Sequence, residues 1–430
     1  MPARLLPPFP LRSRVVRLAL LLPLALLVGC AVNPVTGEQQ LSLVSDREEI
    51  QIGEQQYEPA QQSQGGRYYL DPALQDYVRR VGDKLAAVSD RRLPYEFAVL
   101  DNPVPNAWAL PGGKIAVNSG LLLYLKDEAE LASVLGHEIV HAAARHSDAQ
   151  MSKGSLIGLG AQIAGIVSQQ SGYGNLGGMA AQAGAAAWMA SYGRGAELES
   201  DAYGMEYMVR AGYDPQAAVS VQETFVKLSA GRQPDFLSGL FASHPPSQAR
   251  VEANRGHASR LGSGGLRNAT AYQRATAQLR HDAPAYEAEK KALAALAKKD
   301  SRTAIRQLDA ALKIQPNAGR FWELRGHAWA MQKEWANALD AFSTAIDRNP
   351  GYFRHYLARG ALHFERREYA AAKRDLERSR QLLPTALASL YLGEIALANG
   401  ADRDAAAYYR EAANDPGPVG QKARERLSGR

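Results

Sequence analysis

The 430-residue chain has a single cysteine, Cys30, so a disulfide within one chain is impossible. Its formal net charge of +6 is small for this length, and it has no dense run of Lys and Arg with interleaved aromatic residues, which argues against nucleic-acid binding. With 46% hydrophobic and 22% charged residues, the composition is that of a globular protein, so wholesale disorder is excluded. At this length we expect two or three domains.

The apolar run near the start of the sequence is too short for a standard transmembrane helix. This run, Leu18 to Val28, falls below the roughly 20 residues that a bilayer requires, and the arginines before it fit a secretory signal. It ends in Leu27-Val28-Gly29-Cys30, which resembles a bacterial lipobox, whose cysteine receives a lipid before cleavage. Residues 1–29 are therefore predicted to be a lipoprotein signal peptide with lipidation at Cys30; the alternative is an uncleaved anchor.

The residue after the cysteine bears on the location of the protein. Ala31 follows Cys30, and lipoproteins without Asp at that position resemble those sent to the outer membrane of Gram-negative bacteria. We therefore expect a lipid-anchored protein at the periplasmic face of the outer membrane, or otherwise a soluble periplasmic one. A tether over residues 30–44 contains the turn-rich motif Asn33-Pro34-Val35-Thr36-Gly37.

Periodicity and turn signals predict a mostly helical first domain with a few strands. Tyr95 to Leu100 is typical of a strand, and Asn106 to Val117 is typical of a hairpin that turns on Pro111-Gly112-Gly113. Helices are predicted over residues 45–57, 72–88, 127–145, 195–211 and 215–228. The segment Gly154–Gly195, rich in Gly, Ala and Ser, favours a broken helix or a mobile flap near the active site. A membrane-touching hairpin and a buried helix pair are the alternatives.

From about residue 283 onward the sequence repeats every 34 residues. Prolines recur at this interval, and so do two columns of small residues at positions where paired helices approach closely: Pro316, Pro350, Pro384 and Pro418; Ala304, Ala338, Ala372 and Ala406; Ala311, Ala345, Ser379 and Ala413. Gly326 and Gly360 match this period, whereas Gly393 comes one residue early, so we expect the register to slip once and recover. This is the tetratricopeptide period, which predicts an all-α solenoid over 283–430 with a capping helix at its end, after a linker at 261–282.

The sequence His137-Glu138-Ile139-Val140-His141 carries the strongest chemical signal. Positions i and i+4 share one face of a helix, so His137 and His141 are placed to bind one metal ion. Glu138 stands beside them, where its carboxylate reaches a water at the metal. Zn²⁺ is the expected ion, because two histidines, a carboxylate and one open position suit hydrolysis. The apolar residues that precede the motif on the helix favour a buried site over a solvated helix face.

A third ligand is offered some sixty residues later, by Glu197-Leu198-Glu199-Ser200-Asp201. Glu197 and Asp201 share a face by the same i, i+4 spacing, so Glu197 is the expected ligand and Asp201 the acceptor of a histidine N–H. Glu199 is expected to point away, toward solvent, and stays open as an alternative ligand. His146, which is expected to continue on the first helix because no glycine turn precedes it, is a weaker candidate.

These motifs, together with Ser243-His244-Pro245-Pro246 and Arg250, resemble the zinc peptidase family of the CAAX prenyl-protein endopeptidases and the HtpX heat-shock peptidases. The resemblance covers about residues 45–260, so it implies an α+β zincin-like metalloprotease domain, mostly helical with a small sheet. With the repeats, the chain looks like the periplasmic β-barrel-assembly-enhancing members of this family, whereas the lipobox looks more like its outer-membrane lipoprotein branch. The resemblance thus implies a zinc metalloendopeptidase that binds one Zn²⁺ per chain.

The resemblance also implies roles for individual residues. The zinc ligands would be His137, His141 and Glu197, and Glu138 would be the general base. His244 would stabilise the oxyanion that forms from the attacked carbonyl, and Arg250 would orient His244 or an acidic neighbour. For His244, a capping position before Pro245 is the alternative. A strand edge at Ala107, Trp108 and Ala109 would pair with an extended substrate. We also consider a resting site that is closed by His244 as a fourth ligand, or by the segment Gly154–Gly195.

Three functions are compatible with these features. The first is an endopeptidase that hydrolyses misfolded or stalled envelope proteins, with the repeats docking substrates or the outer-membrane protein assembly machinery. The second is a chaperone or assembly-factor scaffold in which proteolysis is secondary. The third, a structural lipoprotein with an inactive metal site, is disfavoured because ligands, base and supporting carboxylate are all present.

Overall fold

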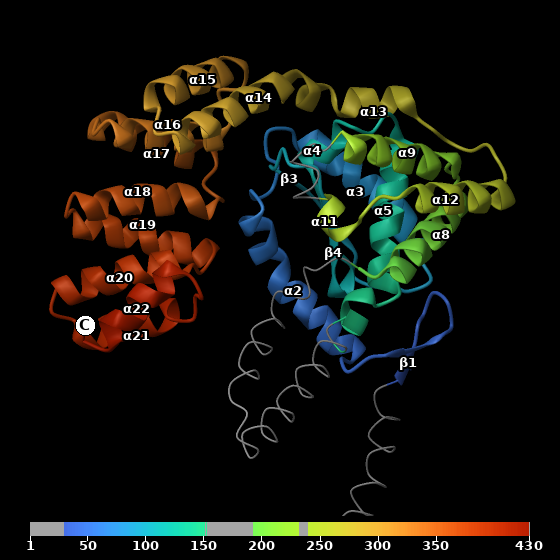
Figure 1. Cartoon of the computed structure of the whole chain (residues 1–430), viewed down its shortest axis with the longest axis horizontal. Helices are drawn as coiled ribbons and strands as arrows, with labels where there is room; N and C mark the ends of the chain where they lie inside the picture. Colours follow the sequence, from blue (N-terminus) through green and yellow to red (C-terminus); the bar gives the residue numbers. More distant parts are fainter. Residues whose placement is uncertain (1–29, 151, 153–191, 232–239, 430) are drawn as a thin grey trace, which may run out of the picture.

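A computed structural model describes residues 30–150, 152, 192–231 and 240–429. The predicted signal peptide and residues 153–191, which make up most of the predicted flap, lie outside the described residues. Among the described helices, none combines the length and the apolar character needed to cross a membrane. The N-terminal part of the chain is mostly helical with small sheets, and the C-terminal part is an arc of paired helices (Figure 1). The fold class predicted from the sequence is therefore confirmed.

The N-terminal part contains a three-stranded sheet. Its order is β3-β5-β4, with β3 (Glu96–Leu100) parallel to β5 (Lys114–Asn118) and β4 (Ala107–Leu110) antiparallel to it. The predicted hairpin is present: β4 and β5 are joined by the short 3-10 helix η1 (Pro111–Gly113). Gly112 and Gly113 have φ of 74° and 84°, which glycine adopts without strain. A second, two-stranded sheet pairs β1 (Cys30–Val32) with β2 (Gln39–Leu41).

Helices cover this sheet and each other. Close to their predicted positions lie α3 (Pro72–Ala86), α5 (Glu128–Ala143), α8 (Arg194–Arg210) and α9 (Gln216–Ala230). Shorter or later helices complete the N-terminal part: α4 (Ser119–Leu122), α11 (Leu240–Ser243), α12 (Gln248–Leu261) and α13 (Ala269–Ala275). One apolar core joins α3, α5, α8 and α9 to the inner face of the sheet, where Ala107, Ile115 and Val117 are 1% exposed or less.

Two glycines bring α5 and α8 into close contact. A Cβ atom added to Gly136 would lie 3.1 Å from the carbonyl oxygen of Gly204, and one added to Gly204 would lie 3.0 Å from the backbone nitrogen of His137. Both distances are shorter than ordinary van der Waals contact, so larger side chains would separate the helices. The glycines thus place the helix of the first motif directly against the helix of the second.

The structure differs from the predicted helices in three places. Helix α2 (Asp46–Ser63) begins at the Ser45 cap but runs past Pro59, six residues beyond the predicted end. Helix α5 ends at Ala143, because Arg145 adopts a left-handed φ of 60° and a new helical turn starts at His146. The predicted linker at 261–282 contains α13 and the start of α14 (Ala277–Ala297), and Tyr272 and Leu279 from these helices are buried in the N-terminal core.

The C-terminal part consists of antiparallel helix pairs, as the period predicts. After α14 follow α15 (Ser301–Ile314), α16 (Gly319–Met331), α17 (Trp335–Arg348), α18 (Phe353–Glu365), α19 (Tyr369–Leu382), α20 (Ala386–Ala398), α21 (Asp402–Ala412) and α22 (Pro418–Leu427). The prediction that the register recovers after Gly393 is wrong. Ala405 and Ala412 are buried at 2% and 0% exposure, whereas Ala406 and Ala413 are only partly buried. The slip therefore persists through the last pair, because Gly393 packs against Tyr409 as Gly326 packs against Phe342.

The repeats are joined to the N-terminal part by buried polar contacts. Asp101, which follows β3, accepts a hydrogen bond from the hydroxyl of Tyr286 at 2.8 Å and faces the guanidinium of Arg320. Arg320 also pairs with Glu289 at 2.8 Å. Further along the solenoid, Gln62 of α2 donates to the backbone oxygen of Gly351 at 2.8 Å. These bonds link α14, α16 and the α17–α18 turn to the end of β3 and to α2.

Candidate metal centre

Helix α5 positions the two histidines of the first motif. Its N-terminus is capped by Asp127, which accepts from the backbone N–H of Glu130, and most of its surface is buried. His137 and His141 lie one turn apart, and their Nε2 atoms are 3.0 Å apart. Burial lowers the pKa of His141 well below its usual value, so this ring is neutral and offers a lone pair. Two imidazoles one turn apart on one helix face can supply two of the ligands of a metal ion.

Helix α8 supplies a carboxylate to the same point. Glu197 Oε1 lies 3.4 Å from His141 Nε2, and Glu197 Oε2 lies 3.6 Å from His137 Nε2. Burial alone raises the pKa of Glu197, but the imidazoles of His244, His141 and His137 outweigh burial and hold the pKa far below its usual value. Glu197 is therefore an anionic oxygen donor that faces the Nε2 atoms of both histidines.

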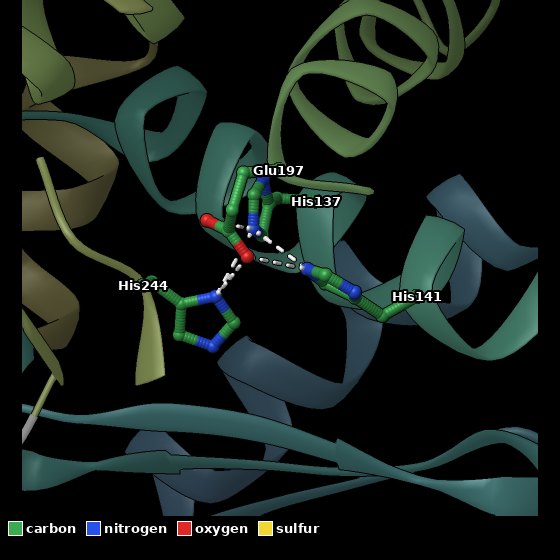
Figure 2. Close-up of side chains that lie close together, drawn as sticks. All are labelled: His137, His141, Glu197 and His244. Carbon is green, nitrogen blue, oxygen red and sulfur yellow. Dashed lines mark hydrogen bonds and ion pairs between the residues drawn. The ribbon is translucent and has the colours of Figure 1, made fainter. Parts of the chain in front are cut away.

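A third histidine reaches the cluster from the residues after α11. His244 Nδ1 lies 3.0 Å from Glu197 Oε1 and 3.4 Å from His137 Nε2. Helix α11 is fixed to the loop before β4, because Leu240 N–H donates to the Pro105 oxygen at 3.0 Å, and His244 N–H donates back to the Leu240 oxygen. Figure 2 shows the side chains of His137, His141, Glu197 and His244 pointing toward one another.

The donor set fits a zinc ion. One ligand atom from each of His137, His141, Glu197 and His244 lies within 4.8 Å of all the others, and all four residues are buried. Three imidazole nitrogens and one carboxylate oxygen form a donor set that suits Zn²⁺. The cofactor expectation is therefore supported by the chemistry of the residues present.

Glu138 lies beside the four-residue cluster. Its Oε1 is 3.4 Å from His244 Nε2, and its Oε2 is buried without a hydrogen-bond partner among the described residues. Burial raises the pKa of Glu138, although His244 and His137 act in the opposite direction. A cavity of about 30 Å³ reaches Glu138, His137 and His244 between α9 and α11. A carboxyl group with a raised pKa at such a cavity is suited to accept and return a proton.

Asp201 and Arg250 hold the side chains of His137 and Glu197 in place. Asp201 Oδ1 lies 2.9 Å from His137 Nδ1, so it accepts the ring N–H when His137 presents Nε2 to the cluster. Arg250, on α12, donates to both oxygens of Asp201 at 2.8 and 2.7 Å and pairs with Glu197 at 2.7 Å. Of the two partners considered for Arg250, the acidic side chains are the ones it contacts.

β4 forms one edge of the three-stranded sheet, and its Ala107 and Ala109 are 0% and 8% exposed. The backbone oxygen of Asn106 accepts from Asn118 of β5, so by alternation the N–H and C=O groups of Ala107 and Ala109 point away from β5. Among the described strands, none pairs with this outer edge. The side chains of these two alanines face α5, whereas Trp108 packs on the other face against Tyr57. The three residues thus lie on the strand that runs beside the zinc-motif helix.

Sequence reasoning misplaced Glu199 and His146 and missed Asn33 and Tyr192. Glu199 is half-buried, not solvated: it accepts from Asn33 Nδ2 at 2.8 Å and lies 3.3 Å from His146 Nε2. Burial raises the pKa of Glu199, but these two partners outweigh burial and leave the pKa below its usual value. His146 turns back toward α5, where its Nδ1 lies 2.9 Å from His141 Nδ1. The ring of Tyr192 stacks on His141 with centroids 3.9 Å apart.

Comparison with known proteins agrees with this geometry. Residues 72–258 match Peptidase family M48, and residues 289–353 and 357–418 match the tetratricopeptide repeat. The first of these regions contains all four residues of the cluster, together with Glu138, Asp201 and Arg250.

Two relatives and one solved structure illustrate the similarity. The chain is 31% identical over 201 residues to the beta-barrel assembly-enhancing protease of Yersinia pestis, covering 44% of this chain and 40% of that protein. It is 35% identical over 158 residues to the mitochondrial metalloendopeptidase OMA1 of Arabidopsis thaliana, covering 37% and 30%. The crystal structure of MamA overlays with a TM-score of 0.29 at 17% identity, covering 43% of this chain and 96% of that one. The chain thus spans less than half the length of these two relatives.

Proposed function

We propose that this chain, whose residues 72–258 belong to peptidase family M48 and whose C-terminal part carries tetratricopeptide repeats, is a zinc-dependent endopeptidase of the bacterial envelope. The observation that carries the proposal is the buried cluster of three imidazoles and one carboxylate, with the unpartnered Glu138 carboxyl oxygen beside it. A buried, charged carboxylate facing two imidazole nitrogens is an arrangement that a divalent cation stabilises.

We assign zinc binding to His137, His141 and Glu197, with one ion per chain. When bound, zinc supplies Lewis-acid chemistry: it polarises a carbonyl and makes a water acidic at neutral pH. Glu138 takes the proton of the attacking water and returns it to the departing amine. The raised pKa of Glu138 suits this double role, because a group that accepts and then releases a proton works best with a pKa near the working pH.

His244 is the proposed partner of the carbonyl oxygen, which becomes negative during the attack. Its ring lies between Glu138 and Glu197, and its pKa is raised by these two carboxylates despite burial, which favours a ring that donates hydrogen bonds. Asp201 and Arg250 are positioning residues: Asp201 orients His137, and Arg250 holds Asp201 and Glu197 together. A resting site closed by His244 as a fourth ligand is the alternative role, and the contact with Glu197 supports it.

Substrate is proposed to bind as an extended strand along β4. The outward N–H and C=O groups of Ala107 and Ala109 would pair with its backbone, and backbone pairing is indifferent to side chains. Such recognition selects for an unfolded stretch of chain, because a folded segment has no free backbone groups. This supports misfolded or stalled proteins as the substrate class.

The cellular setting is inferred from the relatives and from the N-terminus. Relatives named beta-barrel assembly-enhancing protease support action on envelope proteins in a Gram-negative bacterium, with the repeats docking substrates or assembly partners. Cys30 is the proposed lipid-attachment site, which would hold the chain at the periplasmic face of the outer membrane. We also keep the division into a peptidase domain at 45–260 and repeats at 283–430 as part of this proposal. A scaffold in which proteolysis is secondary is the second candidate, favoured by the long solenoid.

One experiment separates the two candidates. Envelope proteomes of cells that make the wild type or Glu138→Gln are compared, and proteins that accumulate and co-purify with the variant are collected. A protease predicts intact proteins trapped on the variant and fragments that appear only with the wild type. A scaffold predicts the same partners and the same fragments with both, an outcome that would contradict the proposed activity.

A further inference from the structure

The N-terminal turn motif Asn33-Pro34-Val35-Thr36-Gly37 lies against the back of the metal centre. Asn33 is only 5% exposed, although it stands near the start of the described chain. Its side-chain oxygen accepts from the backbone N–H groups of Val35 and Thr36 at 2.9 and 3.3 Å. Its backbone pairs with Glu38 and Gly37 at 2.7 and 2.8 Å. The oxygen is thus used within the turn, which leaves the amide nitrogen to reach Glu199 at 2.8 Å.

A line of hydrogen-bonding groups continues from Glu199 to a metal ligand. Glu199 Oε1 lies 3.3 Å from His146 Nε2, and His146 Nδ1 lies 2.9 Å from His141 Nδ1. The other ring nitrogen of His141, Nε2, faces His137 and Glu197. Each side chain in this line is buried or half-buried, so water does not compete freely for its bonds.

The donors and acceptors of the line match in one direction only. With Nε2 of His141 turned to the metal, the ring proton sits on Nδ1 and is donated to His146 Nδ1. The proton of His146 then sits on Nε2 and is donated to Glu199 Oε1. Glu199, which is acceptor-only when ionised, is held in place by the amide of Asn33. Every polar atom of the line then has a partner of the right kind.

We propose that Asn33, Glu199 and His146 form a relay that fixes the tautomer and orientation of His141, so that the N-terminal turn motif acts as a positioning element of the zinc site. The proposal rests on the zinc function above and adds a second support to the one that Asp201 gives His137. Each of the two ligand histidines on α5 is then oriented by a carboxylate. Asp201 orients His137 directly, and Glu199 orients His141 through the imidazole of His146. Groups that orient ligand histidines in this way typically contribute about 10- to 100-fold to metal affinity.

The relay also sets how the N-terminus enters the catalytic unit. Its last member, Asn33, comes three residues after Cys30. A second contact, from Gln40 Nε2 to the backbone oxygen of Ala144 at 2.9 Å, holds the same segment to the end of α5 without touching the relay. These two contacts allow the packing of the segment and the relay itself to be tested separately.

The test measures zinc affinity of the purified chain by competition with a chromophoric chelator, with folding checked by circular dichroism. We expect Asn33→Leu and His146→Leu to weaken zinc binding about 10- to 100-fold, and Gln40→Leu to leave it unchanged. His146→Gln should recover part of the loss, because glutamine offers both an acceptor and a donor. If His146→Leu does not fold, Asn33→Leu carries the test, since Asn33 itself is not a member of the apolar core.

The outcomes are distinct. Equal weakening by Asn33→Leu and Gln40→Leu would show that the segment acts only by packing and would overturn the relay. Wild-type affinity in Asn33→Leu and His146→Leu would overturn it as well. A wild-type chain that binds no zinc would overturn the proposed function itself, and the relay with it.

Discussion

Gly204 of α8 lies directly over the backbone of His137 on α5, so close that a Cβ atom on the glycine would be 3.0 Å from the His137 nitrogen. This contact holds the two halves of the candidate metal site together, because α5 carries the proposed ligands His137 and His141 and α8 carries Glu197. Gly136 faces Gly204 from the other side of the same contact. The distance between the helices is therefore set by two glycines that contribute no side chain to the metal site.

Gly204→Val is expected to separate α5 from α8. Overpacking at this contact should destabilise the fold by at least about 2 kcal/mol and move Glu197 away from the histidines, so zinc content should fall together with the melting temperature. Gly195→Ala, on the first turn of the same helix, is the matched control: among the described residues, no atom lies within 4 Å of its added methyl group. Calorimetry and zinc analysis that show no difference between the two variants would contradict the packing argument.

The proposed zinc roles are separable by three substitutions. His137→Ala and Glu197→Ala should lose the metal, because each removes one of three ligands. Glu138→Gln should keep about one zinc per chain and lose hydrolysis of an unfolded model substrate such as casein. Metal analysis and a fluorogenic cleavage assay make the measurement. Full zinc occupancy in Glu197→Ala would transfer the ligand role to another residue.

His244→Ala distinguishes the two roles weighed for this histidine. As the partner of the oxyanion, His244 contributes to the transition state, so the variant should cleave an unfolded substrate about tenfold more slowly or worse while zinc is retained. The kinetic effect should appear in kcat rather than in KM. Faster cleavage by the variant would instead identify His244 as a group that blocks the resting site.

Arg320→Met tests the junction between the repeats and the peptidase part. The change leaves the buried carboxylates of Asp101 and Glu289 without their cation, which should cost about 3 kcal/mol in the free energy of unfolding. Arg325→Met is the control, because Arg325 pairs with the half-exposed Asp309 and should contribute at most about 1 kcal/mol. Urea unfolding of both variants gives the comparison, and equal losses would contradict the assigned role of the junction.

Glu323 is expected to make the stability of the repeats depend on pH in the acidic range. Burial alone raises its pKa, but hydrogen bonds from His327 and His355 and the charge of Arg354 outweigh burial and hold the pKa below its usual 4.5. The folded state thus binds fewer protons at this site than the unfolded state, so the stabilisation is present above about pH 4.5 and is lost as the pH falls below it.

The measurement is the melting temperature between about pH 6 and pH 3. Wild type should lose stability on acidification more steeply than Glu323→Gln, which lacks the titrating group. At neutral pH the variant should be the less stable of the two, because its neutral amide no longer offers a carboxylate to Arg354 and His355. Parallel acid profiles for the two proteins would refute this account.

The spacing of residues along the sequence was sufficient to predict much of the candidate site and of the fold. The i, i+4 pairs His137/His141 and Glu197/Asp201 follow from helix geometry alone, and the glycines of the hairpin and the 34-residue period are visible in the sequence. In the structure, the two pairs face each other across the α5–α8 contact.

The residues whose positions were predicted wrongly are placed by contacts between segments that are far apart in the sequence. Glu199 lies on the face of α8 opposite to Glu197, where solvent is the simple expectation, yet the N-terminal turn covers that face from 166 residues away. His146 turns back because Arg145 takes a left-handed conformation that no glycine announces. That the one-residue shift in the repeat register persists after Gly393 becomes apparent only from the packing of Tyr409 against Gly393.

The shortness of β4, an edge strand of the sheet, has a consequence for the solubility of the protein. An exposed strand edge is a template for association with other chains, and natural proteins shorten or interrupt such edges. Here Pro103 and Pro105 precede the four residues of β4, and proline donates no backbone hydrogen bond. The edge that is proposed to hold a substrate is thus short and preceded by prolines, two features that limit association between copies of a chain.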